Sequence, residues 1–301
     1  MIISDMHCDS LLTVNSERGL INGYNTSAKH PFLQFFAGFV PCEARPPEVR
    51  RRELMHYFDI YAYECDRLGL TKIENVRGLC AALDMNERCA MFTVEGGGGL
   101  LADSEELFTL HRAGLRIMSL VWDSNELGTS SADELDIGLT PEGVRMAKRC
   151  AELGITIDVS HLSDKSFYEL CEAYPLPIIA THSNFRDICP HHRNLTLDMA
   201  RIIVARGGVI GLNLYPLFVN RPEANLTDLL KHLDYGLEHL GESAIGFGFD
   251  IDGTYGLYPE GIDESASIHD KVCDMLLSRY PASTVERIAG TNVTDFLKGV
   301  L

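Results

Sequence analysis

Short apolar segments alternate with longer amphipathic segments along almost the whole chain. The short segments are rich in apolar or β-branched residues and end at polar or glycine residues, which is typical of buried parallel strands. Seven such segments cover residues 2–6, 89–94, 117–121, 155–159, 178–181, 208–214 and 244–249. The segments between them have helical spacing of apolar residues and cover residues 48–68, 104–113, 141–153, 165–173, 196–205, 226–240 and 268–278. A strand followed by a helix, repeated along the chain, predicts an α/β fold on a parallel sheet.

The number of repeats favours a distorted (β/α)8 TIM barrel, with a doubly wound open sheet as the alternative. The eighth strand is not obvious, and residues 287–289 are a weak candidate. No linker rich in proline or serine interrupts the pattern, so we expect a single domain over residues 1–301. Polar residues lie at or just beyond five strand ends, where barrel enzymes assemble their sites, and this favours the barrel. These residues are His7, Glu95, His161, His182 and Asp250.

The charge balance of the chain excludes some classes of partner. The sequence has 26 Lys and Arg against 43 Asp and Glu, which gives a net charge of −17 at pH 7. A surface this acidic repels phosphate backbones and anionic lipid headgroups, so we expect neither a nucleic-acid nor a membrane partner. No segment reaches the roughly eighteen apolar residues of a membrane span, and the chain does not start with a basic, apolar leader.

The nine cysteines indicate a reducing compartment. They are odd in number, scattered, and include no C-x-x-C pair of the kind that a structural zinc site uses. Such cysteines are typical of small buried side chains in proteins kept reduced. We therefore expect a cytoplasmic protein.

The first strand ends with a histidine and a carboxylate in an H-x-D pattern. His7 and Asp9 point to the same side of an extended chain, so an imidazole and a carboxylate can bind one ion. The pattern is common, and without partners it indicates a surface histidine beside a carboxylate.

A second candidate carboxylate, Glu95, precedes four consecutive glycines at residues 96–99. Glycine allows the backbone to approach a cluster or a substrate closely. A carboxylate can give one oxygen to each of two cations and hold them at the separation useful for hydrolysis. The alternative is a flexible glycine turn with an incidental glutamate.

Two further strands end in histidines. His161 and His182 are 21 residues apart, one strand–helix unit, so they lie on neighbouring strands and are able to bind a second ion. Asp250 ends the seventh predicted strand, and its functional interpretation is a general base or acid beside metal-bound water. An Asx-turn is the alternative for Asp250.

The loop after the fifth predicted strand carries His191, His192 and Arg193. Arginine binds a carboxylate through two parallel hydrogen bonds, which makes Arg193 a candidate for substrate binding. A surface salt bridge explains a single arginine equally well. The other histidines fall in helical or loop contexts and are interpreted as solvated or structural; they are His30, His56, His111, His232, His239 and His269.

Taken together, these motifs resemble the membrane (renal) dipeptidase family of the amidohydrolase superfamily. The resemblance runs from Asp5 to about Leu297. The family opens with an H-x-D motif, matched by His7 and Asp9. It then has a strand-end glutamate before glycines, matched by Glu95.

The later motifs follow in the same order. The family has a histidine in a D-x-x-H-x-S pattern, matched by His161, and another in an S/T-H-S pattern, matched by His182. An arginine followed by asparagine and a helix start corresponds to Arg193, and a D-F-D-G motif corresponds to Asp250 and the residues after it.

The resemblance implies a metal-dependent hydrolase barrel with two Zn2+ ions per chain. It assigns His7 and Asp9 to one ion, His161 and His182 to the other, and Glu95 to both. The implied activity is hydrolysis of the peptide bond of dipeptides by a hydroxide that bridges the two ions.

The resemblance also implies roles around the substrate. Asp250 would carry the proton to the leaving amine, Arg193 would bind the free carboxylate, and a D-residue on the C-terminal side would be tolerated. The alternatives are a related amidohydrolase acting on a lactam, a lactone or an N-acyl amino acid, and a metal-binding relative without turnover. The expected partner is a small-molecule dipeptide, and a homodimer is one candidate assembly.

Two positions depart from the family pattern. Many members have a Thr-His-Asn run after the third predicted strand, and its histidine approaches the scissile carbonyl. Here that position is Trp122, the single tryptophan of the chain. We expect Trp122 to line the substrate pocket, where its indole can only donate a hydrogen bond. Gly98 stands where a bulky side chain often follows the glycines.

Overall fold

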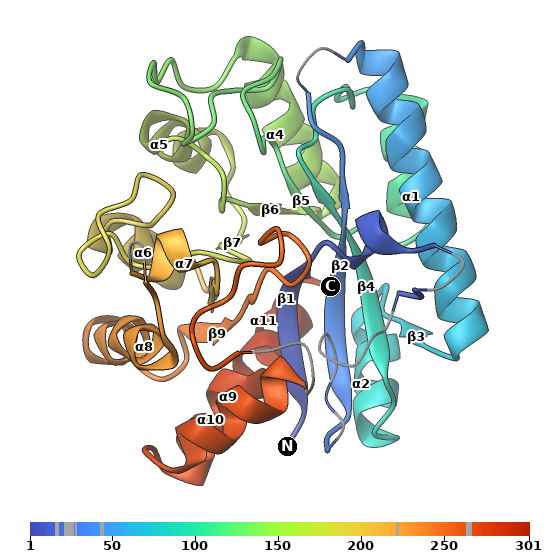
Figure 1. Cartoon of the computed structure of the whole chain (residues 1–301). Coiled ribbons are helices and arrows are strands. Elements are labelled where there is room, and N and C mark those ends of the chain that lie inside the picture. Colours follow the sequence, from blue (N-terminus) through green and yellow to red (C-terminus); the bar gives the residue numbers. More distant parts are fainter. Residues whose placement is uncertain (16–17, 21–26, 28, 43–44, 221–222, 263–266) are drawn as a thin grey trace.

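In the part of the chain that the structure describes, eight parallel strands form a nearly closed barrel with helices around it (Figure 1). The computed structural model describes residues 1–301 except 16–17, 21–26, 28, 43–44, 221–222 and 263–266. Around the barrel the strands follow the order β7 (Ile178–Ile179), β6 (Thr156–Asp158), β5 (Ile117–Ser119), β4 (Cys89–Glu95), β2 (Phe32–Phe39), β1 (Ile3–Cys8), β9 (Ile245–Phe247) and β8 (Ile210–Leu212). A parallel bridge between Ala180 and Ile210 joins the end of β7 to β8. The predicted barrel is therefore confirmed, and the open sheet is not.

The helices pack outside the strands. The main ones are α1 (Pro47–Leu68), α2 (Val76–Asp84), α3 (Glu105–Arg112), α4 (Pro141–Leu153), α5 (Asp164–Ala173), α6 (Leu197–Ala205), α8 (Leu226–Leu240), α9 (Ile268–Leu277) and α11 (Asn292–Val300). Shorter elements are β3 (Thr71–Lys72), which pairs with β4, and η1 (Ser10–Thr13), α7 (Pro216–Val219), α10 (Ala282–Glu286) and η2 (Arg287–Thr291).

Side-chain caps set where several helices begin. The Thr140 side chain accepts a hydrogen bond from the Gly143 N–H, and Pro141 occupies the first turn of α4, where its missing N–H costs nothing. α4 ends at Gly154 in the left-handed conformation, with φ of 69°. Local sequence signals therefore set both ends of this helix.

The eighth strand is β2, a strand that the sequence analysis did not predict. Its residues, 32–39, form an almost unbroken apolar run that pairs with β1 and β4. The candidate at residues 287–289 was wrong, because these residues lie in the π-helix η2, which packs against β1 and β9. Two adjacent apolar residues, Ile288 and Ala289, fit a buried helix face as well as a strand, so periodicity could not decide between them.

A cluster of apolar side chains from several strands underlies the functional end of the barrel. It includes Met6, Phe35, Met91, Ile179 and Val209, all almost fully buried. Side chains of α11 join the same cluster. The strands are therefore held around a packed core, which keeps their carboxyl ends in fixed positions.

Candidate active site

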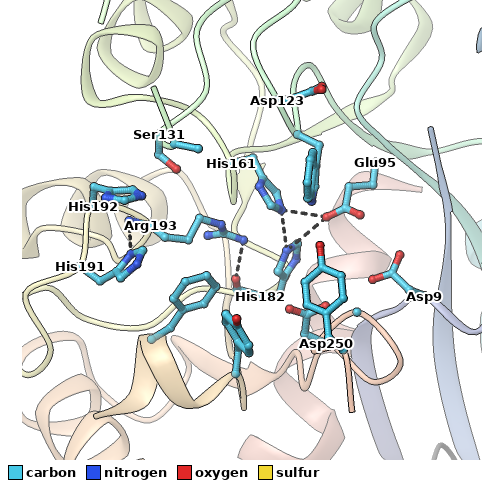
Figure 2. Close-up of a pocket in the computed structure, with 16 residues that line it drawn as sticks. Asp9, Glu95, Asp123, Ser131, His161, His182, His191, His192, Arg193 and Asp250 are labelled. Atoms are coloured by element: carbon cyan, nitrogen blue, oxygen red, sulfur yellow. Dashed lines mark hydrogen bonds and ion pairs between the residues drawn. The ribbon is translucent and has the colours of Figure 1, made fainter. Parts of the chain in front are cut away.

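Side chains from five strand ends meet at the carboxyl end of the barrel (Figure 2). His7 lies in β1, and Glu95 is the last residue of β4. His161, His182 and Asp250 are each the third residue after β6, β7 and β9. The structure thus brings together the five polar residues that the sequence singled out at strand ends.

Glu95 is at the centre of one group of ligand atoms. Its Oε1 lies 2.8 Å from His161 Nε2 and 3.4 Å from His182 Nε2. The two imidazole Nε2 atoms are 3.0 Å apart. These three residues therefore aim their ligand atoms at one small volume, and the three atoms lie within 4.8 Å of one another.

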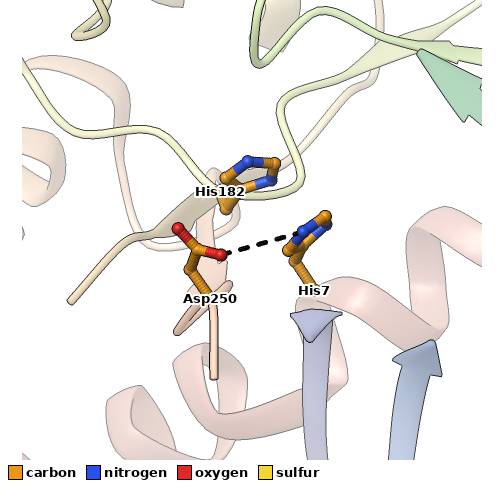
Figure 3. Close-up of side chains that lie close together, drawn as sticks. All are labelled: His7, His182 and Asp250. Carbon is orange, nitrogen blue, oxygen red and sulfur yellow. Dashed lines mark ion pairs between the residues drawn. The ribbon is translucent and has the colours of Figure 1, made fainter. Parts of the chain in front are cut away.

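A second group of ligand atoms surrounds His7. The His7 Nε2 lies 3.4 Å from Glu95 Oε1, 3.5 Å from Asp9 Oδ2 and 3.8 Å from Asp250 Oδ1. The rings of His7 and His182 are close, with centroids 3.7 Å apart, and Asp250 faces both (Figure 3). Glu95 belongs to both groups.

Buried polar atoms in this cluster have no hydrogen-bond partner among the described residues. They include His7 Nε2 and Asp9 Oδ1, in side chains that are 2% and 6% exposed. Buried polar atoms are normally paired, so these atoms need a further partner. Nitrogen and oxygen donors converging in this way fit divalent cations. Because His7 is buried, it is not the surface histidine that the H-x-D pattern by itself would indicate.

Gly253 permits the close approach of two carboxylates. A Cβ at this position would lie 2.2 Å from both Asp250 Oδ1 and Asp9 Oδ2. Asp250 itself has φ of 60°, a left-handed conformation that non-glycine residues rarely adopt. Asn213, just after β8, donates from Nδ2 to Asp250 Oδ2 at 2.9 Å. The turn therefore stores backbone strain to place this carboxylate, as functional sites often do.

Burial shifts the pKa of two carboxylates of the cluster, Glu95 and Asp250, upward. Burial raises the pKa of Glu95 well above its usual range, although the charge on His7 opposes the shift. Burial also raises the pKa of Asp250 to about 7, against the opposing charge on His7 and with help from Asp9. Carboxylates held this closely in a dry site ionise more readily when cations are present.

The histidines of the cluster fall into two kinds. Burial alone would lower the pKa of His7, but the charges of Glu95, Asp9 and Asp250 outweigh it and raise that pKa to about 10. Burial, with the charges of Arg193 and His7, lowers the pKa of His161 and His182 well below its usual range. These two imidazoles are therefore neutral, the form that binds a metal.

Hydrogen bonds behind His182 set its orientation. Its Nδ1 lies 2.8 Å from Thr181 Oγ1, which donates to Asp158 Oδ2 at 2.6 Å. Because that hydroxyl proton is used, His182 Nδ1–H is the donor, and Nε2 keeps its lone pair towards Glu95. Asp158 also accepts from Ser160 Oγ at 2.6 Å, so one carboxylate organises the turns after β6 and β7. Partners of this kind are typical behind metal-binding histidines.

Arg193 lies in the same pocket, opposite the carboxylates (Figure 2). Its Nη1 donates to Ser183 Oγ at 3.0 Å and its Nη2 to the His182 carbonyl oxygen at 3.1 Å. The Nε has no partner among the described residues. Burial lowers the pKa of Arg193 to about 10, although nearby carboxylates, Asp250 first, oppose the shift. At 5% exposure Arg193 is not a surface salt-bridge residue.

Trp122 lines the pocket next to His161. The two ring centroids are 5.9 Å apart, and Phe39 at the end of β2 packs on the other side of the indole at 4.7 Å. The Trp122 carbonyl oxygen accepts a hydrogen bond from Ser130 Oγ at 2.6 Å. The indole is therefore a supported wall of the pocket.

The space beside Gly98 is filled from another element. A Cβ at Gly98 would lie 2.7 Å from Arg50 Nη1 and 2.6 Å from Cys42 Sγ. Arg50, in α1, is 5% exposed and forms an ion pair with Glu126 at 3.0 Å. The glycine therefore leaves room for a buried guanidinium that supports the loop after Trp122.

The pocket is a cavity of about 210 Å³ whose wall includes residues that the sequence analysis missed. These are Asp123, Ser131, Ala132, Tyr215, Phe218, Gly253 and Tyr255. They lie in segments that follow strands, Phe218 within the short helix α7, and apart from Gly253, in the motif that begins at Asp250, no predicted ligand motif marks them. The position of Tyr215 and Phe218 shortly after β8 was the one usable signal, because loops at this face line barrel sites.

The remaining histidines take no part in the cluster. His232 and His269 are fully buried and structural: His232 Nε2 lies 2.9 Å from the Val219 carbonyl oxygen, and His269 Nε2 lies 2.7 Å from Asp5 Oδ2. His56 and His239 are exposed. Over the described residues, no helix is both long enough and apolar enough to cross a membrane.

Known proteins resemble this chain along almost its whole length. A sequence model of the membrane dipeptidase family (peptidase family M19) matches residues 3–300. An uncharacterised protein in the pqqA 5′ region of Klebsiella pneumoniae is 29% identical over 241 residues, which is 74% of this chain and 88% of that protein. The dipeptidase tcpJ of Claviceps purpurea is 28% identical over 219 residues, 71% of this chain. The matched region spans about half, 51%, of that dipeptidase.

A solved structure with the same fold is a metallopeptidase from Rhodobacter sphaeroides bound to a phosphinate mimic of the dipeptide L-Ala-D-Ala. The alignment covers 100% of this chain and 99% of that one, with a TM-score of 0.87 and 22% sequence identity. The likeness extends to the complete barrel.

Proposed function

Because the chain belongs to the membrane dipeptidase family, we propose that it is a zinc-dependent dipeptidase, which hydrolyses the peptide bond of dipeptides. The observation that carries the proposal is the pocket itself. Two groups of ligand atoms share Glu95 at one end, and a buried arginine with a partnerless Nε lies at the other. A dipeptide has a group for each end of the pocket: its peptide bond for the ligand atoms around Glu95, and its free carboxylate for Arg193.

The donor set supports two zinc ions per chain. We assign His7, Asp9 and Glu95 to one ion, and Glu95, His161 and His182 to the other. When bound, the ions lower the pKa of water and polarise the scissile carbonyl group. The protein holds the ligands for them on four rigid strand ends, and the Thr181–Asp158 pair keeps His182 in the tautomer that binds metal.

Asp250 is the residue that moves protons. Asn213 holds Oδ2, so Oδ1 is the oxygen that faces the cluster, where it lies 3.8 Å from His7 Nε2. A carboxylate at this position is able to take a proton from the attacking water and then give it to the leaving amine.

Arg193 binds the free carboxylate of the substrate. Its guanidinium is oriented by Ser183 and the His182 carbonyl oxygen, so its remaining N–H groups are already positioned for an anion. The wall formed by Trp122 limits the pocket beside the scissile bond. The solved relative with a mimic of L-Ala-D-Ala supports tolerance of a D-residue on the C-terminal side.

We also assign the enzyme to the cytoplasm. All nine cysteines are free in the structure, and most are buried. Free cysteines in this number support a reducing compartment.

A substrate panel tests the proposed activity. Purified protein with added zinc would be assayed for release of free amino acid from L-Ala-L-Ala and L-Ala-D-Ala, with the C-terminal amides as controls. We expect cleavage of the dipeptides and poor cleavage of the amides. Hydrolysis of a lactone, a lactam or an N-acyl amino acid without dipeptide cleavage would overturn the proposal. Elemental analysis finding one ion or none per chain would overturn the two-zinc assignment.

A further inference from the structure

The end of the pocket opposite the carboxylates is lined by three consecutive residues that carry nitrogen donors. His191, His192 and Arg193 lie together there, with Asp9, Glu95 and Asp250 on the other side (Figure 2). Three donor residues are more than one α-carboxylate needs, because a single guanidinium already offers a two-bond fork.

His191 is held so that one ring nitrogen faces the protein. Its Nδ1 accepts the Arg193 backbone N–H at 3.1 Å, and the side chain packs against Phe218 with ring centroids 4.7 Å apart. An Nδ1 that accepts a hydrogen bond carries no proton, so the proton is on Nε2. His191, 8% exposed, therefore brings an N–H donor to the wall of the pocket.

His192 stacks beside it at the rim. The two imidazole centroids are 4.2 Å apart. The His192 carbonyl oxygen accepts from Arg186 Nη2 at 3.0 Å, and Arg186 forms a two-bond ion pair with Asp164 at 2.7 and 2.8 Å. The backbone of the rim is therefore anchored while the imidazole itself lines the pocket.

The charges around these imidazoles favour an anion. Arg193 and Arg186 lie next to them. Burial is the main cause that lowers the pKa of His192, and the charges of Arg186 and Arg193 lower it further. Among described residues that line the pocket, the carboxylates are Asp9, Glu95 and Asp250 at the metal end, and Asp123, which accepts the Cys42 backbone N–H at 2.9 Å. A cationic side chain of the substrate would be repelled here, whereas a carboxylate would gain charge-assisted hydrogen bonds.

We propose that His191 and His192 form a subsite for a second carboxylate, so that the enzyme prefers dipeptides whose C-terminal residue is aspartate or glutamate. This inference rests on the proposed dipeptidase function, with Arg193 holding the α-carboxylate. The two imidazoles then receive the side-chain carboxylate of the same residue.

Matched pairs of substrates test the preference. Ala-Asp against Ala-Asn, and Ala-Glu against Ala-Gln, differ only in a carboxylate or an amide, and each would be assayed with the C-terminal residue in the L and the D form. We expect kcat/KM to be about tenfold higher for the acid of at least one pair, the size of effect that charge-assisted hydrogen bonds produce. A ratio of one or below in every pair, with Ala-Ala cleaved, would overturn the subsite and leave the dipeptidase function standing. Absence of any dipeptide cleavage would instead overturn the proposed function.

Two variants test whether His191 and His192 cause the preference for an acidic C-terminal residue. His191→Asn keeps an acceptor for the Arg193 N–H but removes the Nε2–H donor, and His192→Asn removes the second imidazole. We expect each to bring the acid-to-amide ratio towards one, with His56→Asn on the exposed face of α1 as the control that keeps the wild-type ratio. The ratio is unaffected by a general loss of folded protein. An acid preference that persists in both His191→Asn and His192→Asn would contradict the assignment.

Discussion

The two ends of the pocket are built from different parts of the barrel. At the metal end, the candidate ligand atoms come from residues inside strands or up to three residues beyond them, and the side chains are buried except that of His161, which is 12% exposed. At the opposite end, the wall includes the loop that carries His191, His192 and Arg193, and His192 is exposed. The chemistry is thus carried by rigid strand ends, and recognition by the connections between them.

This difference has a physical reason. Several donors bind a metal ion only when their atoms are placed within fractions of an ångström, and strand ends around a packed core provide that accuracy. Loops tolerate sequence change, so they can reshape a substrate pocket without moving the metal ligands. Replacement of the family histidine by Trp122 beside an intact cluster is one such change. Variants at the two ends should therefore fail in different ways.

The largest effect is expected from Glu95→Gln. Loss of one charge from the carboxylate shared by both groups should remove the metals as well as activity, with hydrolysis falling on the order of 10³-fold or more. Metal content and dipeptide hydrolysis would be measured together, with Glu134→Gln on the exposed loop as the control. A variant that keeps close to two ions would show that Glu95 does not join the two groups.

Asp250→Asn separates proton transfer from metal binding at the same end. The amide keeps the shape of the side chain and its neighbour Asn213, but it cannot accept a proton. We expect metal content to stay near the wild-type value while kcat falls by roughly 10² to 10⁴-fold. Near-native turnover in this variant would exclude Asp250 as the proton carrier.

Arg193→Lys tests the recognition end. An ammonium cannot reproduce the planar two-bond fork, so kcat/KM for dipeptides should fall by roughly 30-fold to several thousand-fold, about 2–5 kcal/mol. Metal content should not change. Dipeptide amides should be poor substrates of the wild type and lose little more in the variant. Equal cleavage of a dipeptide and its amide by the wild type would rule out the carboxylate clamp and favour a lactonase or lactamase.

At acid pH, protonation of His232 should lower the free energy of unfolding, because this histidine supports the loop that carries the recognition end. Its Nδ1 accepts the Phe185 N–H at 3.2 Å, and burial lowers its pKa to about 4. The unfolded chain, with a histidine pKa of about 6.5, therefore binds the proton more readily, so stability present above about pH 6.5 is lost as the pH falls towards 4, by up to about 3 kcal/mol. Urea unfolding of the wild type and His232→Gln across this range measures the effect. Equal pH slopes would show that His232 does not contribute.

The smallest effect concerns Trp122. Because Trp122 is the single tryptophan of the chain, the tryptophan fluorescence of the protein reports on the pocket wall. We expect a phosphinate dipeptide analogue to change the emission of wild-type protein, because the indole lies 5.9 Å from His161. An unchanged spectrum at saturating ligand would place Trp122 outside the substrate-binding region.

That the polar residues at the strand ends lie together could be predicted from the sequence. Each of these residues closes an apolar strand segment, and parallel strands in a barrel bring their carboxyl ends to one face. The identification of His7, Glu95, His161, His182 and Asp250 therefore needed only periodicity and the chemistry of the side chains. Strand β2 was not predicted, because periodicity alone does not distinguish a short apolar run in a strand from one in a buried helix.

The sequence indicated Arg193 and Trp122 at the recognition end, and tertiary structure decided the rest of that end and the distances. Only the fold shows that Gly253 makes room for two carboxylates, that Asn213 holds Asp250, and that His191 supports the backbone of Arg193. Loop residues carry no periodic signal, and their contacts join segments far apart in the chain, so local sequence does not encode where their side chains meet. Residue type at strand ends therefore specified the chemistry, whereas long-range packing specified the shape of the pocket in which it acts.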